Sequence, residues 1–257
     1  MTLSRQQKGH IQEVIKTCLR NKFQNYKPES SNMPFHFRLV GKDRMALYSF
    51  IQSLNTTFGT SIFEPVAVAL ANNRFKRAVS QYVVGNRIST GCQIKIQTIM
   101  NELTMGNNPD KTKEIREIRK AAKNGKVNEL RTVKVELFLE SHDGEIFLFD
   151  LKTAKPNISN FKDFKRTLLE WTGIILTQTP QANVNTLIAI PYNPYEPKPY
   201  ERWTLKGMLD LENELKVAEE FWDFLGGEGA YEDLLDCFEQ VGIELREEID
   251  KYFTRFK

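Results

Sequence analysis

Hydrophobic residues recur at helical intervals over the first half of the chain. Between residues 6 and 26 apolar side chains return every three or four positions, which predicts a helix with one buried face. The prolines and serines from Pro28 to Pro34 predict a link to the next helix. Further helices are expected from Asp43 as N-cap, after Thr60, over residues 93–103, and from Asp110 to the Asn124-Gly125 pair. The face of the helix after Asp43 would consist of Leu47, Phe50, Ile51 and Leu54.

From about residue 130 the hydrophobic spacing changes to that of strands. Strands are expected over residues 133–141, 145–152 and 185–191, and a helix from Ser159 or Asn160 separates the last two. The first two strands would form an antiparallel hairpin, and the intervening helix would make the last two parallel.

The expected fold class is therefore α/β, a mixed β-sheet flanked by helices, with an N-terminal helical region. Two helices after Gly227 would close the chain. A single domain over residues 1–257 is expected, mainly helical over 1–128 and forming the α/β core with C-terminal helices over 129–257.

Three ionisable side chains interrupt the apolar hairpin. Glu136 lies in its first strand, and Asp150 and Lys152 lie side by side near the end of the second, which is apolar on both faces. Charges in such strands are costly unless a partner compensates them. A divalent metal held by the two carboxylates would compensate them and supply chemistry. A solvated strand edge or a buried salt bridge is the structural alternative.

The length of the hairpin turn decides whether the two acids meet. A two-residue turn would put Glu136 and Asp150 on opposite faces of the sheet. A three-residue loop, which pairs Ser141 with Glu145, brings the two acids directly across from each other. The sequence predicts the three-residue loop, with Gly144 at positive φ.

Composition excludes several classes of protein. Hydrophobic residues make up 40% of the chain, and no apolar run approaches the roughly 20 residues needed to cross a membrane. The first residues lack the apolar core of a signal peptide. Three separated cysteines and three scattered histidines provide neither a disulfide framework nor zinc spacing. We therefore expect a cytoplasmic protein with reduced thiols and no membrane association.

A net charge of +3 hides an uneven distribution. Residues 209–250 contain 15 acidic and two basic side chains, whereas residues 111–134 contain nine Lys or Arg and three Glu. The basic segment runs directly into the hairpin, an arrangement that suits a polyanionic substrate such as DNA. A solvated helix with mixed charges is the alternative.

A proline-stiffened loop crowded with tyrosines follows the last strand. Rigid loops of this kind suit base reading in a DNA groove, with Asn193, Lys198 and Arg202 as the candidate contacts. A packed loop held by its tyrosines is the structural alternative.

Several lysines and an arginine follow the hairpin. Lys155 is either a contact to a DNA phosphate or a solvated lysine. Surface charge on the outer face of the next helix is the better interpretation of Lys162, Lys165 and Arg166.

This chain resembles the PD-(D/E)xK nucleases in the spacing of its charged residues. Glu136 is followed by a hairpin turn and then by Asp150-Leu151-Lys152. Val135-Glu136 stands where that superfamily usually has Pro-Asp. From about Gly59 onward the chain also resembles the TdeIII-like group of type II restriction endonucleases. The segments that carry this second resemblance are SIFEPVA at 61–67, IPYNPYEPKPYERW at 190–203 and EEFWDFLGG at 219–227.

The resemblance implies a Mg²⁺-dependent endonuclease that hydrolyses phosphodiester bonds of double-stranded DNA. It would act as a homodimer on a short palindromic site with a GGNCC-like core and leave 5′-phosphates. The implied metal ligands are the carboxylates of Glu136 and Asp150 and the carbonyl of Leu151. Lys152 would position the attacking water or stabilise charge developing at phosphorus.

Glu64 is a further candidate ligand, because several nucleases of this fold complete the metal shell with an acid from an upstream helix. Two structural roles compete with this one. Ser61 and Glu64 have the spacing of a capping box, and Pro65 would suit the first helical position with Glu64 as N-cap.

Two other functions remain open. A nuclease of the same fold would act in DNA repair or recombination without sequence specificity. A DNA-binding protein without catalysis would bury the three charges of the hairpin as a salt bridge.

Overall fold

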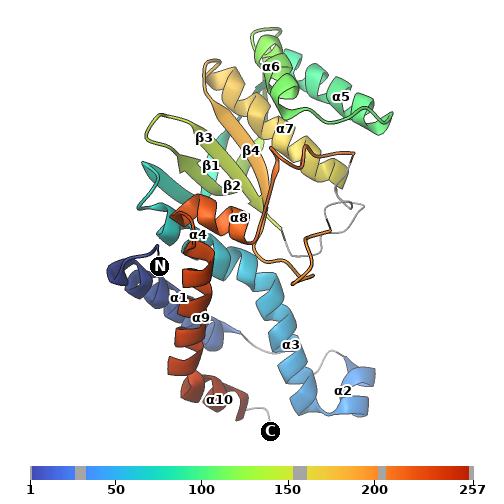
Figure 1. The fold of residues 1–257 in the computed structure, drawn as a ribbon. Coiled ribbons are helices and arrows are strands. Elements are labelled where there is room, and N and C mark those ends of the chain that lie inside the picture. The colour runs from blue at the N-terminus through green and yellow to red at the C-terminus, as the bar shows by residue number, and fades with distance from the viewer. Residues whose placement is uncertain (1, 27–32, 153–160, 202–206, 255–257) are drawn as a thin grey trace.

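The structure is a computed structural model that describes residues 2–26, 33–152, 161–201 and 207–254. Figure 1 shows a β-sheet with helices on either side and, below it, a group of helices drawn from both ends of the chain. The strands are β1 (Arg77–Ser89), β2 (Val127–Glu140), β3 (Ile146–Leu151), β4 (Val184–Ile190) and β5 (Leu215–Val217). The helices are α1 (Arg5–Asn25), α2 (Pro34–Val40), α3 (Lys42–Thr57), the π-helix η1 (Phe58–Phe63), α4 (Glu64–Ala71), α5 (Thr90–Thr104), α6 (Lys111–Ala121), α7 (Phe161–Gln178), α8 (Glu219–Gly226), α9 (Ala230–Glu244) and α10 (Arg246–Thr254).

The sheet has the order β1-β2-β3-β4-β5 and is mixed. Strands β1, β2 and β3 are antiparallel neighbours, whereas β3, β4 and β5 run parallel. Helix α7 connects β3 to β4 and packs on β1 and β4, with α5 and α6 against it. The predicted hairpin, the parallel pair and the α/β class are thus confirmed.

Two strands were not predicted from the sequence. One is β1, whose 13 residues form the edge beside β2, and the other is the short β5 at the opposite edge. Strand β2 also begins at Val127, ahead of the predicted start at residue 133. The sheet is therefore wider than the hairpin and the βαβ unit alone.

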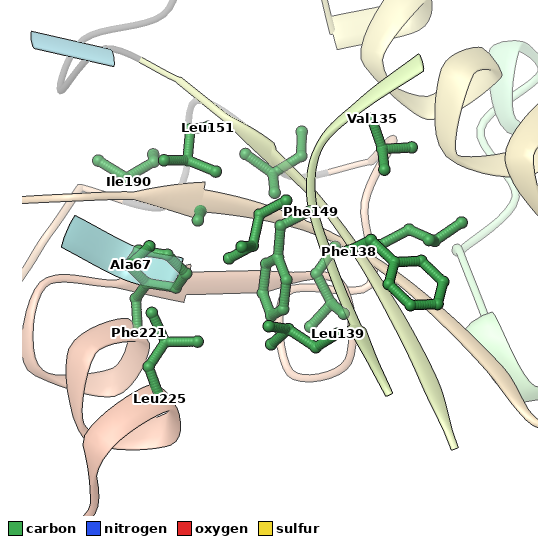
Figure 2. Close-up of a cluster of buried hydrophobic side chains, with 14 of the residues drawn as sticks. Ala67, Val135, Phe138, Leu139, Phe149, Leu151, Ile190, Phe221 and Leu225 are labelled. Atoms are coloured by element: carbon green, nitrogen blue, oxygen red, sulfur yellow. The ribbon is translucent and has the colours of Figure 1, made fainter. Parts of the chain in front are cut away.

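The second strand of the hairpin, β3, is buried on both faces over residues 148–151, as expected. Leu137, Leu148 and Phe149 have no exposed surface. Figure 2 shows Phe149 in the apolar cluster that also contains Phe221 of α8, and the two ring centroids are 5.5 Å apart. Burial of each such side chain stabilises the fold by about 1.5–3 kcal/mol. Phe221 and its neighbour Trp222 are both buried and therefore serve the packing of α8.

An ion pair between Lys8 and Asp233 connects the first helix, α1, with α9 near the other end of the described residues. Helix α1 packs against α9, and the Asp233 carboxylate accepts bonds from the Lys8 Nζ at 2.6 Å and from the backbone N–H groups of Thr2 and Leu3. Burial opposes ionisation of Asp233, but these donors prevail and lower its pKa to about 2. Part of the acidic C-terminal segment therefore pairs with the first helix.

Two predictions about the N-terminal helices are wrong. Helix α3 begins after Gly41 as N-cap, and Asp43 lies inside its first turn. Leu47 and Ile51 of the expected core face are 43% and 47% exposed. Helix α2 occupies the end of the expected link, because a proline is well tolerated in the first turn of a helix.

In the described part of the chain, no helix combines the length and the apolar character needed to span a membrane.

Candidate active site

The hairpin between β2 and β3 has the predicted register. Ser141 N–H donates to the Glu145 carbonyl at 2.9 Å, and Gly144 N–H donates to the Ser141 carbonyl at 3.1 Å, which closes a three-residue loop. Gly144 has φ +82°, a conformation that glycine adopts without steric cost. The ladder runs from Glu140 opposite Ile146 to Leu137 opposite Phe149. One further step in this register puts the two acids of the hairpin opposite each other.

The Glu136 and Asp150 side chains lie close enough for each carboxyl to affect the pKa of the other. The backbone N–H of Leu151 also donates to Glu136 Oε2 at 2.5 Å. Lys152 Nζ lies 2.7 Å from Asp150 Oδ1, and Asp150 is 6% exposed. Three of the residues predicted for catalysis are therefore gathered at the end of β3.

The pKa values of Glu136 and Asp150 are both raised. Burial, followed by the charge of Asp150, raises the pKa of Glu136 to about 7, against the opposing effect of Lys152. Burial also raises the pKa of Asp150, although Lys152 favours its ionised form. The pair consequently holds a proton at a pH where isolated carboxylic acids have lost theirs.

Glu64 joins this pair from the first turn of α4. Its side chain is 1% exposed, and its charge raises the pKa of Glu136, so the two carboxyls lie within electrostatic reach. Both structural roles expected for Glu64 are wrong, since the N-cap of α4 is Phe63 and no side chain caps the helix. The π-helical turn η1 immediately precedes Glu64, and such turns are frequent at functional sites.

Gln81 of β1 is a residue of this site that the sequence did not suggest. Its Nε2 donates to Glu64 Oε1 and Oε2 at 3.0 and 2.9 Å. Ser80 pairs with Leu137 and Tyr82 with Val135, so Gln81 lies opposite Glu136 in the register. Because β1 itself was not predicted, the only available signal was the density of β-branched and aromatic residues around Gln81.

Lys152 is held from two further directions. Its Nζ lies 4.9 Å from the centroid of the Phe164 ring on α7, within the range of a cation–π contact. Its backbone N–H donates to the Ala189 carbonyl of β4 at 2.8 Å. The ammonium group is thereby kept beside the acids while one quarter of the side chain remains exposed.

The residues predicted to contact DNA are only partly described. Lys155 and Arg202 lie outside the described residues. Asn193 donates to the Lys198 carbonyl at 2.8 Å and accepts from the Tyr195 N–H at 3.0 Å, so its amide shapes the loop. The Lys198 side chain is exposed. This loop follows the C-terminal end of β4. Because β3 and β4 are parallel, that end lies beside the C-terminal end of β3, where Asp150 is located.

The interpretation of Lys165 as surface charge is wrong. Its side chain is fully buried, and its Nζ lies 2.6 Å from Glu114 and 2.7 Å from Glu214. Lys111 Nζ lies 2.9 Å from Glu214 and also bonds to Thr186. These four charges tie α6 to α7 and to the segment before β5, and we call them the lysine–glutamate network. The misassignment arose because the helical spacing gave no sign that α6 would cover this face of α7.

Seven of the nine basic residues between 111 and 134 remain exposed, although Lys111 is buried. Arg119 is half-buried and donates to the carbonyls of Pro180 and Ala182. Two of the three glutamates in the segment, Glu114 and Glu117, are withdrawn from full exposure. The surface of the segment is therefore more basic than its sequence.

The carboxyl groups of β2 and β3 suit a hard divalent cation. Within the described ranges no three His, Cys, Asp or Glu side chains form a preassembled metal site. However, Mg²⁺ keeps several waters and commonly takes only one or two carboxylates from a protein. The half-buried carboxyl of Glu136 and the buried carboxyl of Asp150 meet that requirement, because a cation would offset the charge repulsion that helps to raise the pKa of Glu136.

Comparison with known proteins gives a consistent result. Residues 3–242 match the family model described as "Type II restriction endonuclease, HinfI". The chain is 26% identical over 223 residues to the type II restriction enzyme HgiCII of Herpetosiphon aurantiacus, covering 85% of this chain and 80% of that protein. It is 27% identical over 237 residues to the type II restriction enzyme MjaII of Methanocaldococcus jannaschii, covering 82% of this chain and 62% of that protein.

Proposed function

The chain belongs to the HinfI family of type II restriction endonucleases, and we propose that it cleaves DNA with Mg²⁺ at the acids of the β2–β3 hairpin. Site-specific cleavage of DNA is the activity of the family. The choice of residues and of metal is our proposal. It is supported above all by one observation: the half-buried Glu136 lies opposite the buried Asp150 in the hairpin register, and Lys152 is paired with Asp150.

In this proposal Glu136 and Asp150 would each offer one carboxylate oxygen to Mg²⁺, and the Leu151 carbonyl would offer another. When bound, the ion would supply Lewis-acid chemistry, lowering the pKa of a water and neutralising charge on the scissile phosphate. Glu136 must first release its proton, which its pKa of about 7 allows near neutral pH. Lys152 then positions the attacking water or stabilises charge at phosphorus through its Nζ.

Double-stranded DNA would lie against the basic segment and the loop after β4. The exposed lysines and arginines between 111 and 134 supply contacts to phosphates. Lys198 and Asn193, with Lys155 and Arg202, are proposed to contact DNA near the cleaved bond. The rigid loop after β4 would contact bases near the C-terminal end of β3, where Asp150 is located.

We further propose a homodimer that recognises a palindromic site with a GGNCC-like core. Two strands related by a two-fold axis require two active sites related in the same way. The recognition sequence rests on the resemblance to the TdeIII-like group alone.

Digestion of plasmids of known sequence with Mg²⁺, followed by sequencing of the ends, tests the proposal. Discrete fragments with 5′-phosphates at GGNCC-like sites are expected. A smear would favour the non-specific repair or recombination nuclease. DNA binding without cleavage, or cleavage that survives Asp150→Ala, would exclude the proposed mechanism.

A further inference from the structure

The contact between Gln81 and Glu64 is unusual for a buried carboxylate. Elsewhere in this protein the buried glutamates Glu114 and Glu214 are bonded to lysines. Glu64 is as deeply buried, yet its carboxylate accepts hydrogen bonds from a neutral amide, that of Gln81. A neutral donor fixes the orientation of the carboxylate without cancelling its charge, so the charge stays available to a cation.

The backbone of Gln81 also carries strain. Its φ is +51°, in the left-handed region that side chains with a Cβ rarely adopt. Glycine would adopt the same conformation without this cost. Strained conformations cluster at functional sites, where the gain from a correctly aimed side chain offsets them. Here the strained residue lies opposite Glu136 and its amide holds Glu64, so the strain accompanies a contact inside the site.

We propose that Gln81 is a positioning residue that fixes the Glu64 carboxylate as a third acidic group facing the divalent cation of the nuclease site. This inference rests on the function proposed above. Gln81 acts through Glu64, which it orients by donating to both carboxylate oxygens. Its removal should therefore weaken cation binding while leaving the chemistry of Asp150 and Lys152 intact.

Two substitutions separate the side chain from the backbone. Gln81→Met keeps the strained backbone and loses the amide, whereas Gln81→Gly loses the amide and relieves the strain. Mn²⁺ binding to the metal-free protein, followed by electron paramagnetic resonance without DNA, should weaken about tenfold in both variants. The Tm of Gln81→Gly should equal or exceed that of the wild type. At saturating Mg²⁺ both variants should recover most of the wild-type kcat.

Ala218→Gly is the matched control, because Ala218 also has a positive φ, +48°, at the start of α8. It should leave Mn²⁺ affinity unchanged. Coupling supplies a second check: Glu64→Gln should weaken Mn²⁺ binding, and adding Gln81→Met to it should weaken binding no further.

Two outcomes would overturn the inference while the proposed function stands. One is a wild type that cleaves DNA and binds Mn²⁺, together with Gln81 variants of unchanged affinity. The other is a double variant whose losses are simply additive. A wild type that neither binds Mn²⁺ nor cleaves DNA with Mg²⁺ would instead remove the proposed function, and this inference with it.

Discussion

Two of the charge clusters in the described part of the chain differ in their balance. In the lysine–glutamate network two lysines face two glutamates, and all four side chains are at most 6% exposed. At the end of β3 the Glu136 carboxyl lies within electrostatic reach of two other acids, Glu64 and Asp150, and one partly exposed lysine, Lys152, pairs with Asp150. A balanced cluster joins secondary-structure elements, whereas a surplus of buried acid stores unfavourable energy that a cation can relieve. On the function proposed above, the first cluster would serve the fold and the second would serve cation binding.

Asp150→Asn should give the largest effect on activity. It keeps the shape of the side chain and removes one charge that the cation needs, so cleavage should fall by about 10³-fold. The Tm should remain unchanged or rise, because the substitution also removes a buried like charge. Plasmid cleavage and thermal unfolding measure the two quantities, and a large loss of Tm would show that Asp150 belongs to the balanced kind of cluster.

Lys165→Met should have the opposite profile. It leaves Glu114 and Glu214 buried without one of their partners and should cost about 3–5 kcal/mol of unfolding free energy. Molecules that remain folded should cleave DNA within a few-fold of the wild-type rate. Urea unfolding and cleavage per folded molecule provide the comparison. A stable but inactive variant would contradict the structural role of the network.

The pH dependence of stability should distinguish the clusters without changing the wild-type sequence. The pKa of Glu136 is raised from 4.5 to about 7, so the folded protein binds more protons than the unfolded chain between these values. Without metal, stability should therefore fall by about 3 kcal/mol as the pH rises from about 4.5 to about 7.

Glu136→Gln is the control for this pH dependence and should remove most of the fall. Chemical unfolding of metal-free protein at a series of pH values measures it. Saturating Mg²⁺ should also flatten the curve in the wild type, because the ion favours the ionised acids. A fall of equal size in Glu136→Gln would assign the proton uptake to other groups.

Gly144→Ala should give the smallest effect. Nothing lies within 4 Å of the added methyl group, so only the positive φ of +82° opposes it, at about 1 kcal/mol. Gly106→Ala is a matched control, since Gly106 has φ +96° and equally open surroundings after α5. Both should unfold at similarly lower urea concentrations with kcat unchanged. Loss of activity in Gly144→Ala alone would mean that the loop, and not the strand ladder, sets the positions of the acids.

Local sequence was sufficient to predict the hairpin. The number of residues between Glu136 and Asp150 allows few registers, and a glycine in the left-handed position favoured the three-residue loop that puts the two acids opposite each other. The parallel pairing of β3 with β4 followed from the helix between them. These features depend on residues close together in the chain.

The remaining parts of the site depend on contacts between distant segments. Glu64 lies near the hairpin because α4, which follows α3 and η1, packs against β1 and β2. The capping patterns around Glu64 do not predict this packing. Gln81 was not predicted because its strand, β1, was not predicted. The polar residues of β1 interrupt the apolar pattern that would have indicated a strand. Lys165 appeared solvated because its partners, Glu114 and Glu214, are 51 and 49 residues away.

The contact between Asp233 and the first residues has a consequence for biosynthesis. Lys8 and Asp233 are separated by 225 positions, so α1 emerges from the ribosome long before α9 exists. Helix α1 also packs on η1 and α4, the segment that carries Glu64. Translation must therefore reach α9 before the support beneath Glu64 is complete. The surroundings of Glu64 can thus be complete only after α9 has been synthesised.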